Sequence, residues 1–428
     1  MNTRFYNAKI LRTKPNQRFE IEEGELWVQG NRISYLGKSP ERKVREETTW
    51  DREIDAKGNL LMPGFKNAHT HSGMTFLRSL ADDLPLQEWL FQQIFPKEAQ
   101  LVPEDLYWLT ALANLEYLTS GITTQFDMYF FQEEVAKACV DMGFRLVQTS
   151  GLNNFGGSIA ELEEKYLKFN EYHELSSYFL GFHAEYTTSK ELMEGVASLV
   201  QKYKAPLYVH NSETKQEVED CKKRYGLSPT QFLDRLGMYD YGGGGYHCVW
   251  FNDTDINIFA HKGLSAVTNP GSNAKLASGI APIKKMLKAG VNIAIGTDGP
   301  ASNNCLDMWK EMFLVSSLAK LKDMDAAVVD GEQVLYMATA GGAKAMGLGE
   351  ADCLEIGKLA DLILIDLNQP NMQPINHITK NLVYSGSKQN VKLTMVNGKI
   401  LYEENRFFTN LDPAEIYRKA NEIVKRMK

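Results

Sequence analysis

Short apolar runs alternate with longer stretches of helical periodicity between about residues 56 and 350 of the chain. Eight such runs can be counted, and polar residues follow several of them. They are NLLMPGFKNAHTH, GITTQFDM, FRLVQTSG, YFLGFHAE, APLYVHNSE, GGYHCVWF, LSAVTNP and VNIAIGTDG. Repeated βα units have this pattern, and eight of them in roughly 300 residues predict a (β/α)8 TIM-type barrel. A doubly wound open sheet is the alternative, but the sequence contains no Gly-rich fingerprint for it.

Both ends of the chain show β-prone runs instead. Asn397 and Gly398 stand between two alternating runs, which is a strong signal for a β-hairpin. Two separated β-rich ends predict one composite β-sandwich domain. A terminal helix should follow, because Asp412 can cap it and Pro413 suits its first position. The predicted divisions are 1–55 and 351–411 for the two parts of the small domain, 56–350 for the (β/α)8 barrel and 412–428 for the helix.

Composition narrows the classes of partner. The formal net charge of -7 comes without a block of basic residues, so we expect no nucleic-acid partner and favour a small molecule. Hydrophobic residues make up 43% and charged residues 24%, as in soluble globular proteins. No segment approaches the roughly 18 apolar residues of a membrane span, and the start lacks the apolar region of a signal peptide. We therefore expect no membrane association.

The cysteines indicate a reducing compartment. There are five, an odd number, and no two of them form a CxxC pair. This pattern disfavours both a disulfide framework and a thiolate zinc site. The sequence therefore predicts a cytoplasmic protein.

Polar residues with metal-binding chemistry fall at the ends of the predicted barrel strands. His69 and His71 follow the first run, His183 ends the fourth, His210 the fifth and Asp298 the eighth, and His247 lies on the sixth. The C-terminal ends of all strands of a barrel converge on one face. Five of the eight histidines should therefore meet at one mouth.

Four of these residues form a candidate metal site. His69 and His71 point to the same side of an extended segment and can share one ion, although such a pair alone fits an ordinary turn equally well. His210 and Asp298 add a nitrogen and an oxygen, which completes a set for zinc, with iron or manganese also open. The alternative is a group of satisfied core side chains. One ion is expected, because the fourth strand ends in His183 rather than a lysine that could bridge two metals.

Neighbouring residues have the chemistry of acid-base catalysis. Glu213 comes three residues after His210 and suits a proton shuttle between the hydrolytic water and the substrate; the alternative is a helix cap or a surface residue. His247 can orient the water or stabilise developing charge, or else it is a buried histidine bonded to backbone. His183 either binds substrate or holds its loop.

At these residues, and over nearly its whole length, the chain resembles the amidohydrolase superfamily, and within it the 5-methylthioadenosine/S-adenosylhomocysteine deaminases. The resemblance rests on a set of motifs. They are MPGFKNAHTHSGMTFLRSLADDLPLQEWL, FPKE, VHNSET, HCVW, NPGSNAKLASGIAPI, GTDGPASNN and GKLADLILID.

The resemblance implies a role for each matching position. His69, His71, His210 and Asp298 would be the metal ligands, Asp298 would also relay a proton from the water, Glu213 would protonate the ring nitrogen beside the attacked carbon, and His247 would lie next to the hydroxide. Glu98 would bind ribose hydroxyls, His183 would contact the substrate, and Trp89 would pack near the base unless it is a plain core aromatic. The implied reaction is hydrolytic deamination of an aminopurine nucleoside to its inosine-type product, with release of ammonia and without an organic cofactor.

Two positions depart from the family pattern. Ser150 stands in TSGL where the family commonly has an arginine for the far end of the substrate. A serine provides no bidentate cationic clamp for a carboxylate, which favours 5'-methylthioadenosine or adenosine over S-adenosylhomocysteine. Thr268 replaces the usual histidine of the His-Asn-Pro sequence after the seventh strand.

Other functions stay open at this point. A guanine-type or triazine-type aminohydrolase or chlorohydrolase would share the ligand set. A catalytically silent barrel is an alternative of another class, but such a protein would be expected to lack ligands that this sequence retains. Neither the physiological substrate nor the formation of a homo-oligomer is decided by the sequence.

Overall fold

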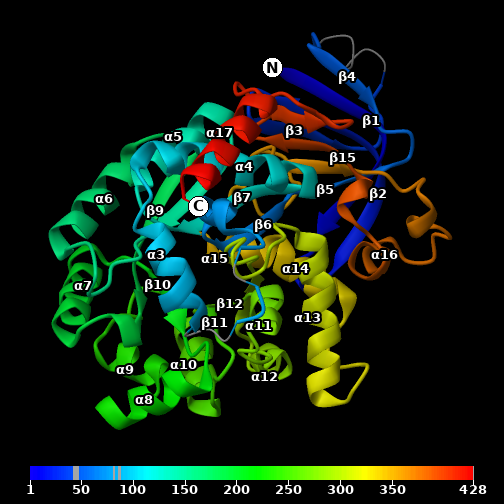
Figure 1. Ribbon diagram of the computed structural model, residues 1–428. Coiled ribbons are helices and arrows are strands. Elements are labelled where there is room, and N and C mark those ends of the chain that lie inside the picture. Colours follow the sequence, from blue (N-terminus) through cyan, green and yellow to red (C-terminus); the bar gives the residue numbers. More distant parts are fainter. Residues whose placement is uncertain (42–47, 81, 85–87, 428) are drawn as a thin grey trace.

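Eight parallel strands, one from each predicted βα unit, form a nearly closed barrel in the computed structural model, which describes residues 1–41, 48–80, 82–84 and 88–427 (Figure 1). They are β6 (Phe65–Thr70), β7 (Ile122–Met128), β8 (Arg145–Thr149), β9 (Ser176–Ala184), β10 (Leu207–Asn211), β11 (Gly243–His247), β12 (Ser265–Thr268) and β13 (Asn292–Ile295). Each strand pairs in parallel with the next along the chain. The predicted barrel is therefore confirmed.

Helices connect the strands and surround the barrel (Figure 1). They are α3 (Phe95–Glu98), α4 (Pro103–Ser120), α5 (Gln132–Met142), α6 (Ile159–Glu171), α7 (Lys190–Tyr203), α8 (Lys215–Tyr225), α9 (Pro229–Arg235), α10 (Asp253–Lys262), α11 (Pro270–Lys275), α12 (Ile283–Lys288), α13 (Met308–Asp323), α14 (Gly331–Ala338) and α15 (Ala340–Ala345), with the short 3-10 helices η1 (Ser72–Leu77) and η3 (Glu185–Thr187) and the π-helix η2 (Trp89–Ile94). None of the helices in the described ranges is long and apolar enough to cross a membrane.

Side chains and backbone join the first and last barrel strands, β6 and β13. Asn67 on β6 accepts a hydrogen bond from the Thr297 amide and donates one to the Thr297 hydroxyl, both at 2.8 Å. The amide of Asp298 donates to the carbonyl of His69 at 3.0 Å. Both Asn67 and Thr297 are fully buried. These contacts bring the end of β6 against the residues that follow β13.

Both ends of the chain contribute to a second, mixed sheet of nine strands, as predicted (Figure 1). Its members are β1 (Asn2–Thr13), β2 (Phe19–Gln29), β3 (Arg32–Gly37), β4 (Arg52–Asp55), β5 (Leu60–Pro63), β14 (Leu362–Ile365), β15 (Val391–Val396), β16 (Lys399–Glu403) and β17 (Arg406–Phe407). Strand β5 lies between β1 and β14, so it joins the two chain ends. The helices and turns associated with this part are α16 (Ile378–Tyr384), η4 (Pro370–Met372), η5 (Lys388–Asn390) and α17 (Pro413–Arg426).

The first of the eight apolar runs, NLLMPGFKNAHTH, is divided between the mixed sheet and the barrel. Residues 60–63 form β5 of the mixed sheet, and the barrel begins with β6 at Phe65. Gly64 lies at the transition, where a Cβ would approach Thr123 Cγ2 to 2.1 Å. Long-range strand pairing, rather than the local apolar run, thus decides that residues 60–63 belong to the mixed sheet.

The local signals near the C-terminus are confirmed. Asn397 and Gly398 have φ values of 50° and 74°, as a type I′ turn requires, and they connect β15 to β16. The side chain of Asp412 accepts a hydrogen bond from the Ala414 amide and caps α17, which has Pro413 at its first turn. Residue 428, at the end of the predicted helix, lies outside the described residues.

A buried ion pair links the mixed sheet to the barrel. Arg145 at the start of β8 binds Asp361 through two hydrogen bonds of 2.6 and 3.0 Å. Asp361 also accepts from the Asn397 amide at 2.7 Å. Burial acts to raise the pKa of Asp361, but the nearby guanidinium outweighs it and the pKa is lowered. The pair therefore stays charged in a dry interface.

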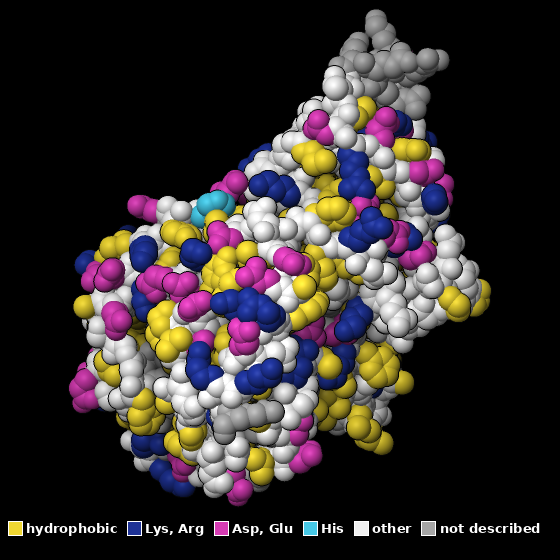
Figure 2. Space-filling model, turned by 45° about the horizontal axis from the view of Figure 1, so that its top comes forward, with side chains coloured by type: hydrophobic (Ala, Val, Ile, Leu, Met, Phe, Trp, Pro, Cys, Tyr) yellow, Lys and Arg dark blue, Asp and Glu magenta, His cyan; other side chains and the backbone are white. Residues whose placement is uncertain are grey.

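Charged side chains of both signs are interspersed on the face of the molecule that Figure 2 shows. The molecular surface carries exposed ion pairs, for example Lys215 with Glu219 on α8 at 3.4 Å. Exposed pairs of this kind contribute little to stability. This face has no extended patch of side chains with only positive or only negative charge.

Replacing Asp361 with alanine should lower the free energy of unfolding by about 3–5 kcal/mol, because Arg145 would stay buried without its partner. Urea denaturation followed by circular dichroism measures the change. The matched control is Glu219→Ala, which breaks an exposed pair and should cost less than about 1 kcal/mol. Equal shifts for the two variants would contradict the importance of the buried pair.

Candidate metal centre and active site

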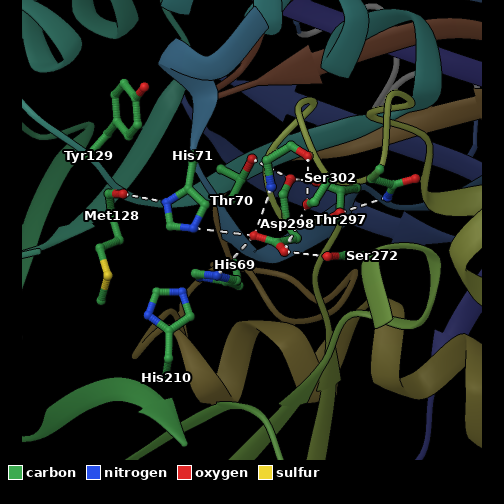
Figure 3. Close-up of polar contacts among 12 residues, drawn as sticks. His69, Thr70, His71, Met128, Tyr129, His210, Ser272, Thr297, Asp298 and Ser302 are labelled. Carbon is green, nitrogen blue, oxygen red and sulfur yellow. Dashed lines mark hydrogen bonds and ion pairs between the residues drawn. The ribbon is translucent and has the colours of Figure 1, made fainter. Parts of the chain in front are cut away.

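Residues from three strand ends converge at the mouth of the barrel (Figure 3). The imidazole centroids of His69 and His71 lie 4.8 Å apart, and that of His210 lies 4.9 and 5.4 Å from them. Ligand atoms within 4.8 Å of one another form two overlapping groups, and both contain His69. One group is His69, His71 and His210, and the other is His69, His247 and Asp298.

Backbone carbonyls orient two of these imidazoles. Nδ1 of His71 lies 2.5 Å from the carbonyl oxygen of Met128, and Nδ1 of His210 lies 2.7 Å from that of His183. In each ring Nδ1 therefore donates, which leaves the Nε2 lone pair available for a ligand. Burial lowers the pKa of His210 well below its ordinary value. The neutral form of the ring, the form that binds metals, is thereby favoured.

His69 gives the clearest indication that an ion fits here. Its side chain is fully buried and stacks on Tyr246 with a centroid distance of 3.8 Å. Within the described part of the chain, Nδ1 has no hydrogen-bond partner, and the nearest oxygen to Nε2 in an ion pair is Asp298 Oδ1 at 3.4 Å. Burial lowers the pKa of His69 to about 3, so the ring is neutral. An unpaired buried nitrogen is costly, and coordination of a cation by these residues would remove that cost.

Asp298 places one carboxylate oxygen toward the histidines and the other away from them (Figure 3). Oδ1 lies 3.4 Å from Nε2 of His69 and 3.2 Å from Nε2 of His71. Oδ2 accepts hydrogen bonds from the hydroxyls of Ser272 at 2.6 Å and Ser302 at 3.0 Å. Burial acts to raise the pKa of Asp298, but the contacts with His69 and His71 outweigh it and hold the pKa well below its ordinary range. The group is therefore an ionised carboxylate.

Glu213 and His247 lie beside this cluster. Glu213 Oε1 is 3.9 Å from Nδ1 of His247, and Nε2 of His247 is 4.0 Å from Oδ2 of Asp298. Nδ1 of His247 has its close partner in the side-chain oxygen of Asn273, at 2.8 Å. Burial raises the pKa of Glu213, so its carboxyl group retains a proton more readily than an exposed one. The structure thus brings together the acid and the histidine that the sequence indicated.

The backbone is strained at these strand ends. His247 and Asp298 have φ values of 70° and 59°, and Ser212, between His210 and Glu213, has 54°. Residues other than glycine rarely adopt this left-handed conformation, which costs on the order of 1–3 kcal/mol each. Such strain is concentrated at functional sites, where it directs side chains that regular strands would turn away.

Two predicted substrate contacts are connected to the cluster. Glu98 on α3 is buried and accepts a 2.6 Å hydrogen bond from the hydroxyl of Tyr129, whose ring centroid lies 6.1 Å from that of His71. Burial raises the pKa of Glu98 to about 7. The ring of His183 lies 4.8 Å from that of His210, while its Nδ1 contacts Thr187 at 2.9 Å.

Two other predicted substrate contacts, Trp89 and Ser150, form no hydrogen bond, ion pair or ring contact with the cluster among the described residues. Trp89 is buried in the main hydrophobic core, and its Nε1 has no partner within the described part of the chain. The hydroxyl of Ser150 accepts a 3.0 Å hydrogen bond from the Leu152 amide, so it is used within its own turn. Residues 81 and 85–87 of the motif that leads to Trp89 lie outside the described residues.

Several site residues were not singled out in the sequence. Ser272, Asn273, Ser302 and Tyr129 contact the predicted residues directly. Ser272 and Asn273 directly follow the seventh apolar run, so the rule that found the histidines could also have found them. Tyr129 directly follows the second apolar run, so the same rule covers it, whereas Ser302 lies further from a strand end and carried no such signal.

Comparisons with known proteins agree on one family. A sequence model of the amidohydrolase family matches residues 60–401. The chain is 38% identical to the 5-methylthioadenosine/S-adenosylhomocysteine deaminase of Thermoanaerobacter pseudethanolicus, over 100% of both chains. It is 39% identical to the 5'-deoxyadenosine deaminase of Methanobrevibacter smithii, over 96% of this chain and 95% of the relative. The crystal structure of an adenosine deaminase from Xanthomonas campestris with bound zinc superposes with a TM-score of 0.92 and 33% identity, covering 99% and 98% of the two chains.

Replacing His69 with alanine should remove the nitrogen that the two ligand groups share. We expect zinc affinity to fall by more than about 100-fold, since losing even an outer partner of a ligand typically costs about 10- to 100-fold. Metal content after dialysis, measured by mass spectrometry of the dissolved protein, tests this. His261→Ala, at an exposed histidine on α10, is the matched control and should keep its zinc. Undiminished metal in the His69 variant would contradict the site.

Proposed function

The chain belongs to the amidohydrolase family, and we propose that it is a metal-dependent hydrolytic deaminase that converts an aminopurine nucleoside to its inosine-type product and ammonia. The observation that carries the proposal is the convergence of His69, His71, His210 and Asp298 beside a buried Glu213. The full-length similarity to deaminases of methylthioadenosine and 5'-deoxyadenosine supports the nucleoside class.

His69, His71, His210 and Asp298 are the proposed ligands of one divalent ion. Zinc is preferred, because a relative of similar structure is described with bound zinc; iron and manganese suit the same ligands. When bound, such an ion lowers the pKa of water so that hydroxide is available near neutral pH. The neutral imidazoles of His69 and His210 and the ionised Asp298 contribute to the donor set that the ion needs. At His71, burial acts to lower the pKa, but the contacts with Asp298 outweigh it and raise the pKa to about 9, so this ring must release a proton when it binds the ion.

Three side chains of this chain move or direct protons in the proposed reaction. Glu213, whose pKa is raised by burial, donates a proton to the ring nitrogen beside the amine-bearing carbon. His247 directs the attacking water through Nε2, and the Asp298 carboxylate takes up the proton of the water. The water oxygen bonds to the carbon, the carbon–nitrogen bond breaks, and the amine leaves as ammonia after receiving that proton. The second proton of the water returns to Glu213 as the new hydroxyl becomes the carbonyl of the product.

Substrate binding is assigned to the residues around this centre. Glu98 would accept hydrogen bonds from ribose hydroxyls, His183 would contact the substrate, and Trp89 would pack near the base. Ser150 offers no positive charge, and its hydroxyl already accepts from Leu152. We therefore expect methylthioadenosine, adenosine or a related 5'-deoxynucleoside to be preferred over S-adenosylhomocysteine. Thr268, which is buried at the end of β12, is also expected to affect which nucleoside is preferred.

A second candidate within the superfamily is an aminohydrolase or chlorohydrolase of guanine or a triazine. The position of Glu98 near His71, through Tyr129, favours a ribosyl substrate instead. A silent barrel is disfavoured because all four ligands and Glu213 are present. We also propose a cytoplasmic location, which the five free cysteines support. The four-part division of the chain and a homo-oligomeric state stay predictions.

Replacing Glu213 with glutamine should keep the bound metal and lower kcat by about 10²- to 10⁴-fold, because glutamine cannot donate the proton. Initial rates of ammonia release and metal content together measure this. Glu194→Gln on the exposed face of α7 is the control and should keep the wild-type rate. A Glu213 variant with full activity would remove this residue from the mechanism.

A substrate panel tests the proposed specificity. Zinc-loaded protein is offered adenosine, 5'-methylthioadenosine, 5'-deoxyadenosine, S-adenosylhomocysteine, guanine and a chlorotriazine, with products identified by mass. We expect kcat/KM for the first three to exceed that for S-adenosylhomocysteine by at least about tenfold, since a missing charged contact of about 1.5–3 kcal/mol corresponds to that factor or more. Turnover of guanine or the triazine alone would overturn the nucleoside assignment.

A further inference from the structure

The segment of residues 270–278, which follows β12, reaches all three residues to which proton transfer or water positioning was assigned. The Ser272 hydroxyl donates to Oδ2 of Asp298 at 2.6 Å. The side-chain oxygen of Asn273 lies 2.8 Å from Nδ1 of His247. The Ser278 hydroxyl donates to Oε1 of Glu213 at 3.4 Å. The segment after β12, a strand that carries no proposed metal ligand, thus contacts Asp298, His247 and Glu213.

The same segment is also anchored to residues outside the catalytic cluster. The Gly271 amide donates to Oε2 of Glu311 at 2.8 Å, and a Cβ at Gly271 would approach Oε1 of that residue to 2.4 Å. The Lys275 ammonium donates to the side-chain oxygen of Asn304 at 2.8 Å and also contacts Asp82. These anchors attach the segment to α13 and to the loop after β13. Its polar side chains are therefore fixed before substrate arrives.

We propose that residues 270–278 form a positioning arm for the catalytic groups, with Asn273 as the residue that sets the orientation of His247. The inference rests on the proposed function, which gives His247 its role. Asn273 and His247 are 2% and 1% exposed, and at 2.8 Å their hydrogen bond is shorter than either ion-pair distance of the imidazole. The other polar neighbours of the ring, Glu213 and Asp298, lie at 3.9 and 4.0 Å.

The chemistry of an amide suits this task. Its oxygen accepts from Nδ1–H and selects the tautomer in which Nε2 is unprotonated and directed toward Oδ2 of Asp298. An amide brings no net charge to this contact. The hydrogen bond to Asn273 holds the imidazole in one orientation on a backbone that is itself in the left-handed region, with φ of 70°. Asn273 is thus a positioning residue that acts through His247.

A double-mutant cycle with His247 distinguishes positioning from general structural support. Asn273→Ala should lower kcat about 10- to 100-fold with little change in KM, as for other outer partners of functional histidines. In a His247→Ala background the same substitution should cost less than about threefold, because the residue through which it acts is gone. Equal losses in both backgrounds, or no loss in the first, would overturn the proposal. The assay uses whichever compound of the panel the wild-type protein deaminates.

The tautomer of His247 provides a readout that needs no turnover. In zinc-loaded protein with ¹⁵N-labelled histidine, the signal of His247 is the one missing from His247→Ala. We expect Nδ1 to be protonated in the wild type and in Asn273→Asp, which keeps the acceptor oxygen, and a mixture of tautomers in Asn273→Ala. Protonation at Nε2 in the wild type, or an unchanged spectrum in Asn273→Ala, would refute the role of Asn273 even if the protein deaminates none of the compounds.

A buried asparagine elsewhere serves as the matched control. Asn114 on α4 is buried and bonds to Cys139 and Gln125, away from the site. Asn114→Ala should lower thermal stability but leave kcat and the His247 signal unchanged. If it lowered kcat as much as Asn273→Ala does, the effect of Asn273 would be general loss of packing and the proposal would fail.

Discussion

The contact between the first and last barrel strands is the interaction on which the site depends. Asn67 bonds to Thr297 through two hydrogen bonds, and the Asp298 amide bonds to the His69 carbonyl. These groups are buried, so the bonds form without competition from water. They hold Asp298 against His69 although more than half of the chain separates the two residues. Without this closure His69 and His71 would not have the Asp298 carboxylate beside them.

Burial then sets the protonation states that the proposed chemistry needs. It raises the pKa of Glu213, whereas the neighbouring histidines hold the pKa of Asp298 well below its ordinary range. The two carboxyl groups lie on opposite sides of His247, at 3.9 and 4.0 Å. One can therefore act as an acid and the other as a base in the same site, which is how acid and base roles are commonly divided between carboxyl groups in enzymes.

Rigid surroundings offset the unfavourable free energy of such a site in a marginally stable protein. The left-handed backbone at His247 and Asp298, and the unpaired Nδ1 of His69, are each unfavourable by themselves. A continuous hydrophobic core and a buried ion pair between Arg145 and Asp361 hold the strands that carry them. The positioning arm after β12 is held in the same way. Glu311 and Asn304, which bind it, are not among the residues assigned to the reaction.

The sequence by itself determined the eight βα units, the Asn397-Gly398 hairpin, the capped terminal helix and the likeness to the amidohydrolases, because periodicity, turn chemistry and motif spacing are local properties. It also marked His69, His71, His210, Glu213, His247 and Asp298, since a barrel brings all strand ends to one face. Only the tertiary structure decided that residues 60–63 pair in the mixed sheet, that Arg145 meets Asp361 and that Asn273 bonds to His247. These contacts join residues far apart in the chain, and their geometry follows from strand pairing and packing, which no local pattern records.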